Sequence, residues 1–214
     1  MKVNYRLQDE FLKEFFTSRF GEKFYLTGGT ALARFYFHHR VSVDLDLFTN
    51  IQEVDFAGVQ AEARRIFSTM KLKIEKAVLT DTFIQYIAGS LKVDLVKDVP
   101  VHFGKIRIKN GVRIDSLENI GSNKILAIFG RIDPKDFIDL YFILHKSKLS
   151  FDQLYGLAGK KDLGLTEFYL AGSVDNFLTK KPKLKLTAAL DRKDFLKFYG
   201  EIKAYLLKRA KPAK

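Results

Sequence analysis

Two aspartates separated by a single residue, Asp44 and Asp46, have the residue type and spacing to do chemistry. They lie in the segment VSVDLDLF (41–48), where polar and apolar residues alternate with the period of a β-strand. Alternate strand residues project from one face, so we expect the two carboxylates to lie about 7 Å apart and Leu45 and Leu47 to face the core. Such carboxylates repel unless a cation lies between them, and Mg²⁺ prefers carboxylates together with phosphates. The alternative is a wet strand edge with solvated acids, which the apolar flanks disfavour.

A glycine turn and a third aspartate extend this pattern. Gly28, Gly29 and Thr30 lie between a predicted strand, KFYLT, and a predicted helix, ALARFYFHH, which Thr30 is expected to cap. Backbone N–H groups at such a turn suit a phosphate, although a Gly-Gly pair alone is more often only a turn and no P-loop pattern is present. Asp94 lies in SLKVDLV on a separate predicted strand, where a solvated acid is the alternative.

The segments GGTAL, HHR and SVDLDLF, within residues 26–48, resemble the AbiE-type (AbiEii-like) toxin family of nucleotidyltransferase-like proteins. The more general signature of the nucleotidyltransferase superfamily is Gly-Gly or Gly-Ser followed by DxD. A second segment, NKILAIFGRIDPKDFIDLYFIL (123–144), resembles later motifs of the family, a lysine in K-I/L-x-A and a D-x-x-D. In residues 150–214 we match no family motif.

This resemblance implies nucleotidyl transfer that depends on Mg²⁺ or Mn²⁺. By position, Asp44 and Asp46 would hold the metal ions, and Asp94 would be the third carboxylate of the metal site, which activates the attacking hydroxyl. Gly28, Gly29 and Thr30 would cradle the triphosphate of an NTP.

Four further residues enter through the later motifs or their position beside the DxD strand. Lys124 would neutralise a phosphate of the nucleotide, and Arg40 would also reach a phosphate. Asp136 and Asp139, three residues apart on one helical face, would be site residues. The alternatives are a solvated surface lysine for Lys124 and, for Asp136, a capping partner of Asp133.

Neighbouring side chains favour structural roles. His38 and His39 are expected to end a helix, where a cation suits the helix dipole. Phe35, Tyr36 and Phe37 are expected to be core residues.

The elements around these residues predict an α+β fold, a nucleotidyltransferase-like mixed sheet flanked by helices and followed by an α-helical C-terminal domain. The first domain, 1–114, has predicted helices at 7–19 and 54–70, strands at 72–79, 82–88 and 91–97, and a hairpin at Asn110-Gly111. The second, 115–214, begins with Asp115 and Glu118 spaced as a capping box. Its other helices are expected at 134–146, 151–158, 166–178 and 188–210. We expect the active site in the cleft between the domains.

Composition excludes several classes of protein. The 214 residues include no cysteine, which excludes disulfides, thiolate metal sites and a cysteine nucleophile. Neither an HExxH motif nor an apolar run long enough to cross a membrane is present, and the N-terminus does not resemble a signal peptide. We expect a cytoplasmic protein.

The net charge is +12, and residues 180–214 contain twelve Lys or Arg against three acidic residues. This basic tail is either solvated charge or a face that binds a polyanion, for which RNA is the favoured candidate.

Together these features predict an enzyme that moves a nucleoside monophosphate from an NTP to an RNA hydroxyl, preferably a tRNA 3′ end. The resemblance implies a toxin of a toxin–antitoxin or phage-defence system, with a separately encoded antitoxin. Transfer to a protein hydroxyl and a non-catalytic RNA-binding module are the alternatives.

Overall fold

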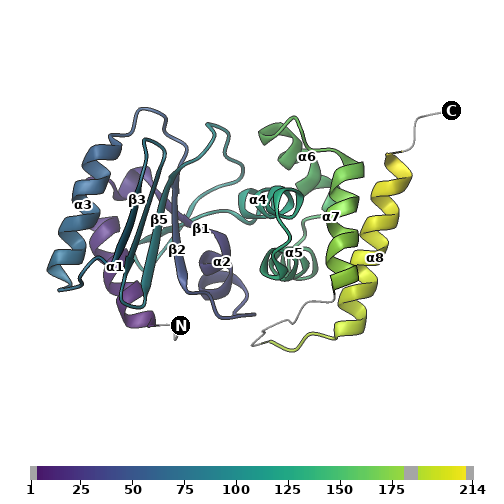
Figure 1. The fold of residues 1–214 in the computed structure, drawn as a ribbon, viewed down its shortest axis with the longest axis horizontal. Coiled ribbons are helices and arrows are strands. Elements are labelled where there is room, and N and C mark those ends of the chain that lie inside the picture. Colours follow the sequence, from purple (N-terminus) through teal and green to yellow (C-terminus); the bar gives the residue numbers. More distant parts are fainter. Residues whose placement is uncertain (1–3, 181–187, 211–214) are drawn as a thin grey trace. The chain divides into compact units, whose positions relative to one another are not determined.

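A computed structural model describes residues 4–180 and 188–210 of the chain (Figure 1). The chain forms two compact units, one of Met1–Tyr36 with Val41–Ser116 and one of Phe37–Arg40 with Leu117–Lys214. Phe37–Arg40 therefore belongs to the second unit, although it connects two parts of the first.

The first unit is built on one seven-stranded sheet with the order β3-β4-β5-β2-β1-β7-β6. β2 pairs in parallel with β5 and β1 with β7, whereas the other neighbours are antiparallel. The sheet is therefore mixed, and the predicted α+β class is confirmed. The strands are β1 (Tyr25–Thr27), β2 (Asp44–Thr49), β3 (Lys76–Leu79), β4 (Phe83–Ala88), β5 (Leu91–Lys97), β6 (Arg107–Lys109) and β7 (Val112–Ile114).

Helices α1 (Tyr5–Thr17) and α3 (Phe56–Thr69) cover one face of this sheet, and α2 (Gly28–Ala31) lies on the other (Figure 1). A short 3-10 turn (Gly21–Lys23) follows α1, and a π-helical segment (Leu32–Tyr36) continues α2. The apolar side chains of α1 recur at helical spacing, and their rings pack against α3, with the centroids of Phe11 and Phe67 5.1 Å apart. The apolar side chains of β2 and β5 pack into this core on the face that α1 and α3 cover. The opposite face of these two strands carries polar side chains.

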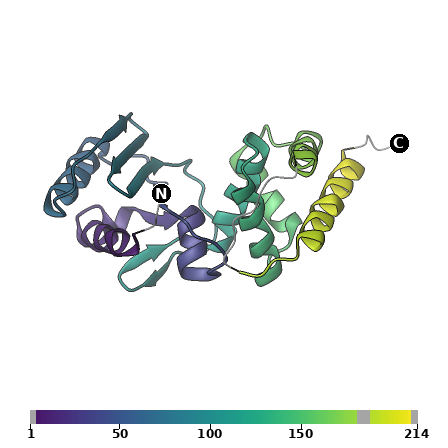
Figure 2. The same cartoon turned by 60° about the horizontal axis from the view of Figure 1, so that its bottom comes forward.

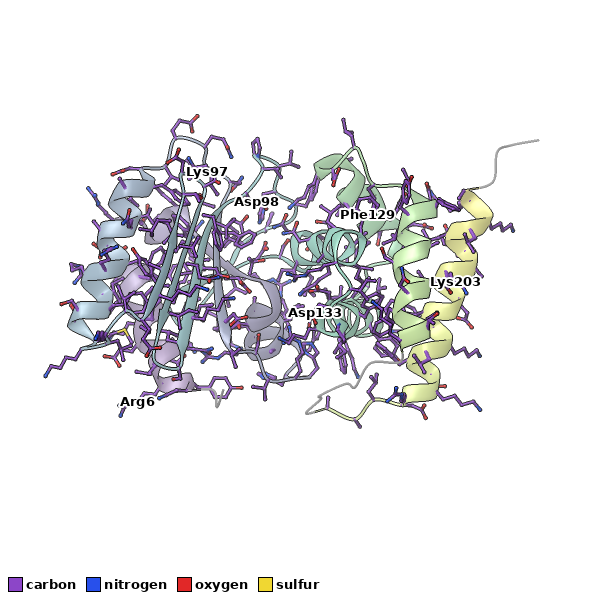
Figure 3. The ribbon with its side chains drawn as sticks, viewed as in Figure 1. Arg6, Lys97, Asp98, Phe129, Asp133 and Lys203 are labelled. Atoms are coloured by element: carbon purple, nitrogen blue, oxygen red, sulfur yellow. The ribbon has the colours of Figure 1, made fainter. Side chains whose placement is uncertain are left out.

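The second unit is helical, as Figure 2 shows, and its helices are α4 (Leu117–Gly130), α5 (Pro134–Lys146), α6 (Phe151–Lys161), α7 (Glu167–Lys180) and α8 (Arg192–Arg209). The carboxylate of Asp133 caps α5 by accepting the N–H of Lys135, and Asp133 is labelled at the start of that helix in Figure 3. An aromatic core joins α5, α7 and α8, with Phe137 stacked on Phe177 at 3.8 Å and Tyr199 donating to the carbonyl of Phe137.

Three local predictions are wrong. The helix after β1 begins at Gly28, so Thr30 lies inside it, and the hydroxyl of Thr30 donates to the carbonyl of Asp44 instead of capping. The helical segment ends at Tyr36, so His38 and His39 lie beyond it. α4 begins at Leu117, and the carboxylate of Asp115 turns to other partners, described below.

Candidate active site

The three predicted metal-site aspartates lie on two adjacent parallel strands. β2 and β5 pair so that Asp46 stands beside Asp94 and Asp44 beside Lys92. The leucines that follow Asp44 and Asp46 are fully buried in the opposite direction, as strand alternation requires. Asp94 is only 9% exposed, so the alternative of a solvated strand acid is wrong for it. Sheet register therefore brings the three carboxylates to one face.

The Gly28 turn approaches Asp46 closely. Gly28 follows the strand β1, in which Thr27 stands opposite Asp46. Its φ of +66° favours glycine, and a Cβ built on it would lie 2.5 Å from Oδ2 of Asp46. Only glycine therefore lets this backbone pass so near to the carboxylate.

Lys92 places its ammonium group among these carboxylates. Its Nζ lies 3.2 Å from Oδ2 of Asp94 and 3.5 Å from Oδ2 of Asp44. Burial alone lowers the pKa of Lys92, but the charges of Asp94 and Asp44 raise it by more than burial lowers it. The pKa of Lys92 is therefore above its ordinary value. Lys92 is thus a cation held between two acids.

A buried aspartate supports the strand that leads into the glycine turn. Asp115 is fully buried, and its carboxylate accepts the hydroxyl of Thr27 at 2.5 Å. Its other oxygen lies 2.9 Å from Nε2 of His102 and accepts the N–H of Ser116 at 2.8 Å. Since Thr27 directly precedes Gly28, this network fixes the backbone from which the turn departs.

The second unit holds a separate buried cluster centred on Asp139. One oxygen of Asp139 accepts Nε of Arg40 at 2.6 Å and lies 2.7 Å from Nε2 of His39. The other accepts Nη2 of Arg40 and pairs with Nζ of Lys124, each at 2.7 Å. Burial alone raises the pKa of Asp139, but Lys124 and Arg40 outweigh it and hold that pKa well below its usual range.

Asp136 is the second acid of this buried cluster. Its carboxylate pairs with Lys124 at 2.7 Å and with Arg131 at 2.9 Å. Burial alone raises the pKa of Asp136, but Lys124 and then Arg131 lower it below its ordinary value. Lys124 is itself buried, and although burial lowers its pKa, the two aspartates raise it on balance. The solvated alternative for Lys124 is therefore wrong, and the side chain of Asp136 binds cations rather than capping.

A family model for the "Nucleotidyl transferase AbiEii toxin, Type IV TA system" matches residues 10–206. The chain belongs to this AbiEii family. It is therefore a nucleotidyltransferase of a toxin family, as its sequence predicts, and that family implies a nucleotide substrate and an antitoxin partner.

Two solved structures share the fold. A candidate nucleotidyltransferase from H. pylori is 19% identical, with a TM-score of 0.59 over 96% of this chain and 93% of its own. JHP933 from Helicobacter pylori is also 19% identical, with a TM-score of 0.58 over 97% and 94%. No curated protein sequence matches the chain significantly.

The predicted site residues of this AbiEii protein fall into two groups. The first unit brings together Asp44, Asp46 and Asp94 with the turn that contains Gly28, Gly29 and Thr30. The second unit brings together Arg40, Lys124, Asp136 and Asp139. Their catalytic and nucleotide-binding roles stay predictions.

Three residues that contact the predicted site residues were not predicted from the sequence. Lys92 became visible only through the register of β2 with β5, and Arg131 through its ion pair with Asp136. The sequence predicts His39 at a helix end, but the side chain is fully buried against Asp139. Its place beside Arg40, next to the DxD strand, was the only sequence signal available.

The carboxylate face has the donor chemistry that a hard divalent cation needs. Oδ1 of Asp94 is buried and has no hydrogen-bond partner in the described part of the chain. The backbone of Gly28 passes so near to Asp46 that a Cβ on it would meet Oδ2 of that carboxylate at 2.5 Å. Among residues 4–180 and 188–210, no three His, Cys, Asp or Glu side chains form a ready ligand set as they stand. The oxygen donors nevertheless fit Mg²⁺, and the ammonium of Lys92 occupies a position that favours positive charge.

A cavity of about 530 Å³ lies elsewhere, in the second unit, and none of the predicted site residues line it. Its walls include Phe129 and Lys203, both labelled in Figure 3, together with Phe168 and Tyr169.

None of the helices in the described ranges has the length and apolar character needed to span a bilayer.

Proposed function

We propose that this enzyme transfers a nucleoside monophosphate from an NTP to the hydroxyl of an RNA, with a tRNA 3′ end as the preferred acceptor, in a reaction that depends on Mg²⁺ or Mn²⁺. The observation that supports it best is the meeting of Asp44, Asp46 and Asp94 on one face of two parallel strands, beside the backbone of Gly28. The biological role that we propose is that of the toxin of a toxin–antitoxin or phage-defence system.

In this proposal the first unit performs the chemistry. Asp44 and Asp46 would hold the metal ion, which when bound neutralises charge on the attacking and leaving oxygens of phosphoryl transfer. Asp94 would accept the proton of the attacking hydroxyl, and its Oδ1, which has no hydrogen-bond partner among the described residues, is the atom available for this. The acceptor oxygen then bonds to the α-phosphorus as the bond to the bridging oxygen breaks, and pyrophosphate leaves.

The Gly28 turn would position the triphosphate for that attack. The hydroxyl of Thr30 is committed to the carbonyl of Asp44, so Thr30 acts by tying the turn to the carboxylate strand. Asp115 would add to this by fixing Thr27, one residue before the turn. The turn and the acids are thereby held by the same hydrogen-bonded framework.

Positive charge supports an RNA acceptor. The chain carries +12 overall, and α8 exposes Lys193, Lys197 and Lys208. Lysines of this kind bind phosphates without regard to sequence, which suits a polyanionic acceptor. Lys181, Lys183 and Lys185 of the predicted basic tail lie outside the described residues.

The test is transfer from α-labelled NTPs in the presence of Mg²⁺, offered total RNA in one reaction and total protein in another. We expect label on RNA, and none with Asp46→Asn. Label on protein alone would replace RNA by a protein hydroxyl as the acceptor. RNA binding without transfer to either would indicate a non-catalytic module.

A further inference from the structure

Lys92 is the only lysine of β5 whose ammonium group contacts the carboxylates of the described site. It stands opposite Asp44 in the parallel register, and its Nζ reaches both Asp44 and Asp94. Its side chain is 27% exposed, so it is neither a buried structural lysine nor a freely solvated one. The other lysine of this strand, Lys97, lies over the ring of Phe56 at 5.2 Å.

This position conflicts with the binding of a divalent cation. Two like charges a few ångström apart repel, so a metal ion held by Asp44 and Asp46 would compete with the ammonium of Lys92 for Asp44, the carboxylate that they share. The four-carbon stem of a lysine is flexible, and its point charge can move to another anion within reach. A triphosphate that enters beside these carboxylates would supply such an anion.

We propose that Lys92 is the resident counter-ion of the carboxylate site and couples metal binding to nucleotide binding. In the free enzyme its ammonium neutralises Asp44 and Asp94. When metal and nucleotide bind together, the carboxylates would hold the metal and the ammonium of Lys92 would move to the triphosphate. This inference rests on the proposed metal-dependent transfer and assigns to that site an ordered way of loading.

A thermodynamic consequence follows from this exchange. A metal ion that binds without nucleotide must displace Lys92 and leaves the lysine without a new partner. The affinity of the free enzyme for the metal ion is therefore weak. Nucleotide gives Lys92 a partner and therefore strengthens metal binding. By linkage, metal strengthens nucleotide binding by the same factor.

Lys92→Met removes the charge and keeps most of the apolar stem, so it separates the counter-ion from packing. The binding of Mn²⁺ is measured by calorimetry without nucleotide and with a non-hydrolysable α,β-methylene NTP analogue, corrected for Mn²⁺ bound to the free analogue. We expect the variant to bind Mn²⁺ alone about tenfold more tightly than the parent enzyme. The analogue should then strengthen Mn²⁺ binding much less in the variant than in the parent.

Two further variants serve as controls for this experiment. Lys97→Met removes the same charge from the same strand away from the carboxylates, and it should leave both Mn²⁺ affinity and coupling unchanged. Lys92→Arg keeps the charge and should keep the coupling. Thermal melting adds a readout without nucleotide, because Lys92→Met should melt below the parent in metal-free buffer and regain the difference when Mn²⁺ is added.

The outcomes separate this inference from the function on which it rests. Equal Mn²⁺ affinity and equal coupling in the parent and Lys92→Met, with binding lost in Asp46→Asn, would overturn the role of Lys92 alone. A similar gain in Lys97→Met would reduce the effect to general charge and also overturn it. If neither the parent nor Lys92→Met binds Mn²⁺, with or without the analogue, the metal-dependent function itself fails.

Discussion

At the residue scale, Asp46 is the side chain at which the proposed metal site and the glycine turn meet. It pairs in register with Thr27 on one side and with Asp94 on the other. A change at this position therefore tests both the proposed metal site and the repulsion between the carboxylates.

Asp46→Ala is expected to reduce transfer below detection and to leave the free energy of unfolding within about 0.5 kcal/mol of the parent or slightly above it. The reason is that a metal ligand is lost while one carboxylate repulsion is relieved. Transfer from α-labelled NTP and urea unfolding measure the two effects. Asp81→Ala, at an exposed turn, is the matched control and should change neither. Normal turnover in Asp46→Ala would exclude it as a metal ligand.

Lys124→Ala tests the buried cluster of the second unit. It leaves Asp136 and Asp139 with one cation fewer in a buried place, so we expect a loss of about 3–5 kcal/mol in the free energy of unfolding. Lys146→Ala, at an exposed position of α5, should cost less than about 0.5 kcal/mol. In conditions where the variant stays folded, NTP use should weaken more than RNA binding. A loss of RNA affinity in Lys124→Ala with unchanged NTP kinetics would contradict a role of Lys124 in nucleotide binding.

The acidic limb of the stability curve should report on Asp139. Because its pKa is lowered in the folded protein, its contribution is fully present above the unfolded Asp value of about 3.9 and is lost as pH falls toward the folded value. Urea unfolding between pH 5 and pH 2 should therefore show a fall in stability that steepens below about pH 4. Asp139→Asn should be less stable at pH 5 and show a shallower fall. An unchanged slope would show that Asp139 is not the group responsible.

At the element scale, the β1–α2 turn is where local sequence rules and tertiary structure disagree. A Ser/Thr N-cap rule placed the helix start at Thr30, but the helix begins at Gly28, with a positive φ, directly against Asp46. The strands, by contrast, were predicted well, because alternation in 41–48 and the turns at Gly89 and Gly111 are local signals.

Long-range pairing explains what the sequence could not predict. Lys92 meets Asp44 only because β2 and β5 pair in parallel across nearly fifty residues of chain. His39 meets Asp139 across a hundred positions, through packing within the second unit rather than through strand pairing. Residue types and period identified the acids, but their counter-ions depend on register and packing, which no local pattern contains.

Gly28→Ala and Gly111→Ala form a matched pair for testing the turn. Both glycines have positive φ, +66° and +77°, but an added Cβ meets Asp46 at position 28 and nothing within 4 Å at position 111. We expect Gly111→Ala to cost about 1–2 kcal/mol through its backbone alone and to leave transfer intact. Gly28→Ala should cost more and abolish transfer. Equal costs and retained transfer would show that the approach to Asp46 is not required.

At the scale of the whole molecule, the charge of +12 is the property on which the proposed RNA acceptor depends. Charge binds phosphates through counter-ion release, which makes affinity fall steeply with salt but conveys no sequence information. Under the proposed function, the choice of one RNA end would therefore come from geometry, and the basic surface would only concentrate RNA near the enzyme. An experiment on RNA binding therefore has to compare variants that lose the same number of positive charges at different places on the protein.

Replacing Lys193, Lys197 and Lys208 of α8 by Gln is expected to flatten the salt dependence of RNA binding, by about 0.7 in log–log slope for each phosphate that the protein no longer neutralises. Fluorescence anisotropy with a single-stranded RNA at several salt concentrations measures this slope. The control replaces Lys71, Lys73 and Lys76, exposed lysines of the first unit, and so removes the same charge elsewhere.

The two triple variants divide the possible outcomes cleanly. A flatter slope for the α8 variant alone would locate the RNA-binding surface on that helix, and Mn²⁺ binding should be unaffected because the carboxylates are unchanged. Equal flattening in both would mean that only net charge matters. No change in either would leave no role for these lysines in RNA binding, and transfer to a protein hydroxyl would then become the better account of this enzyme.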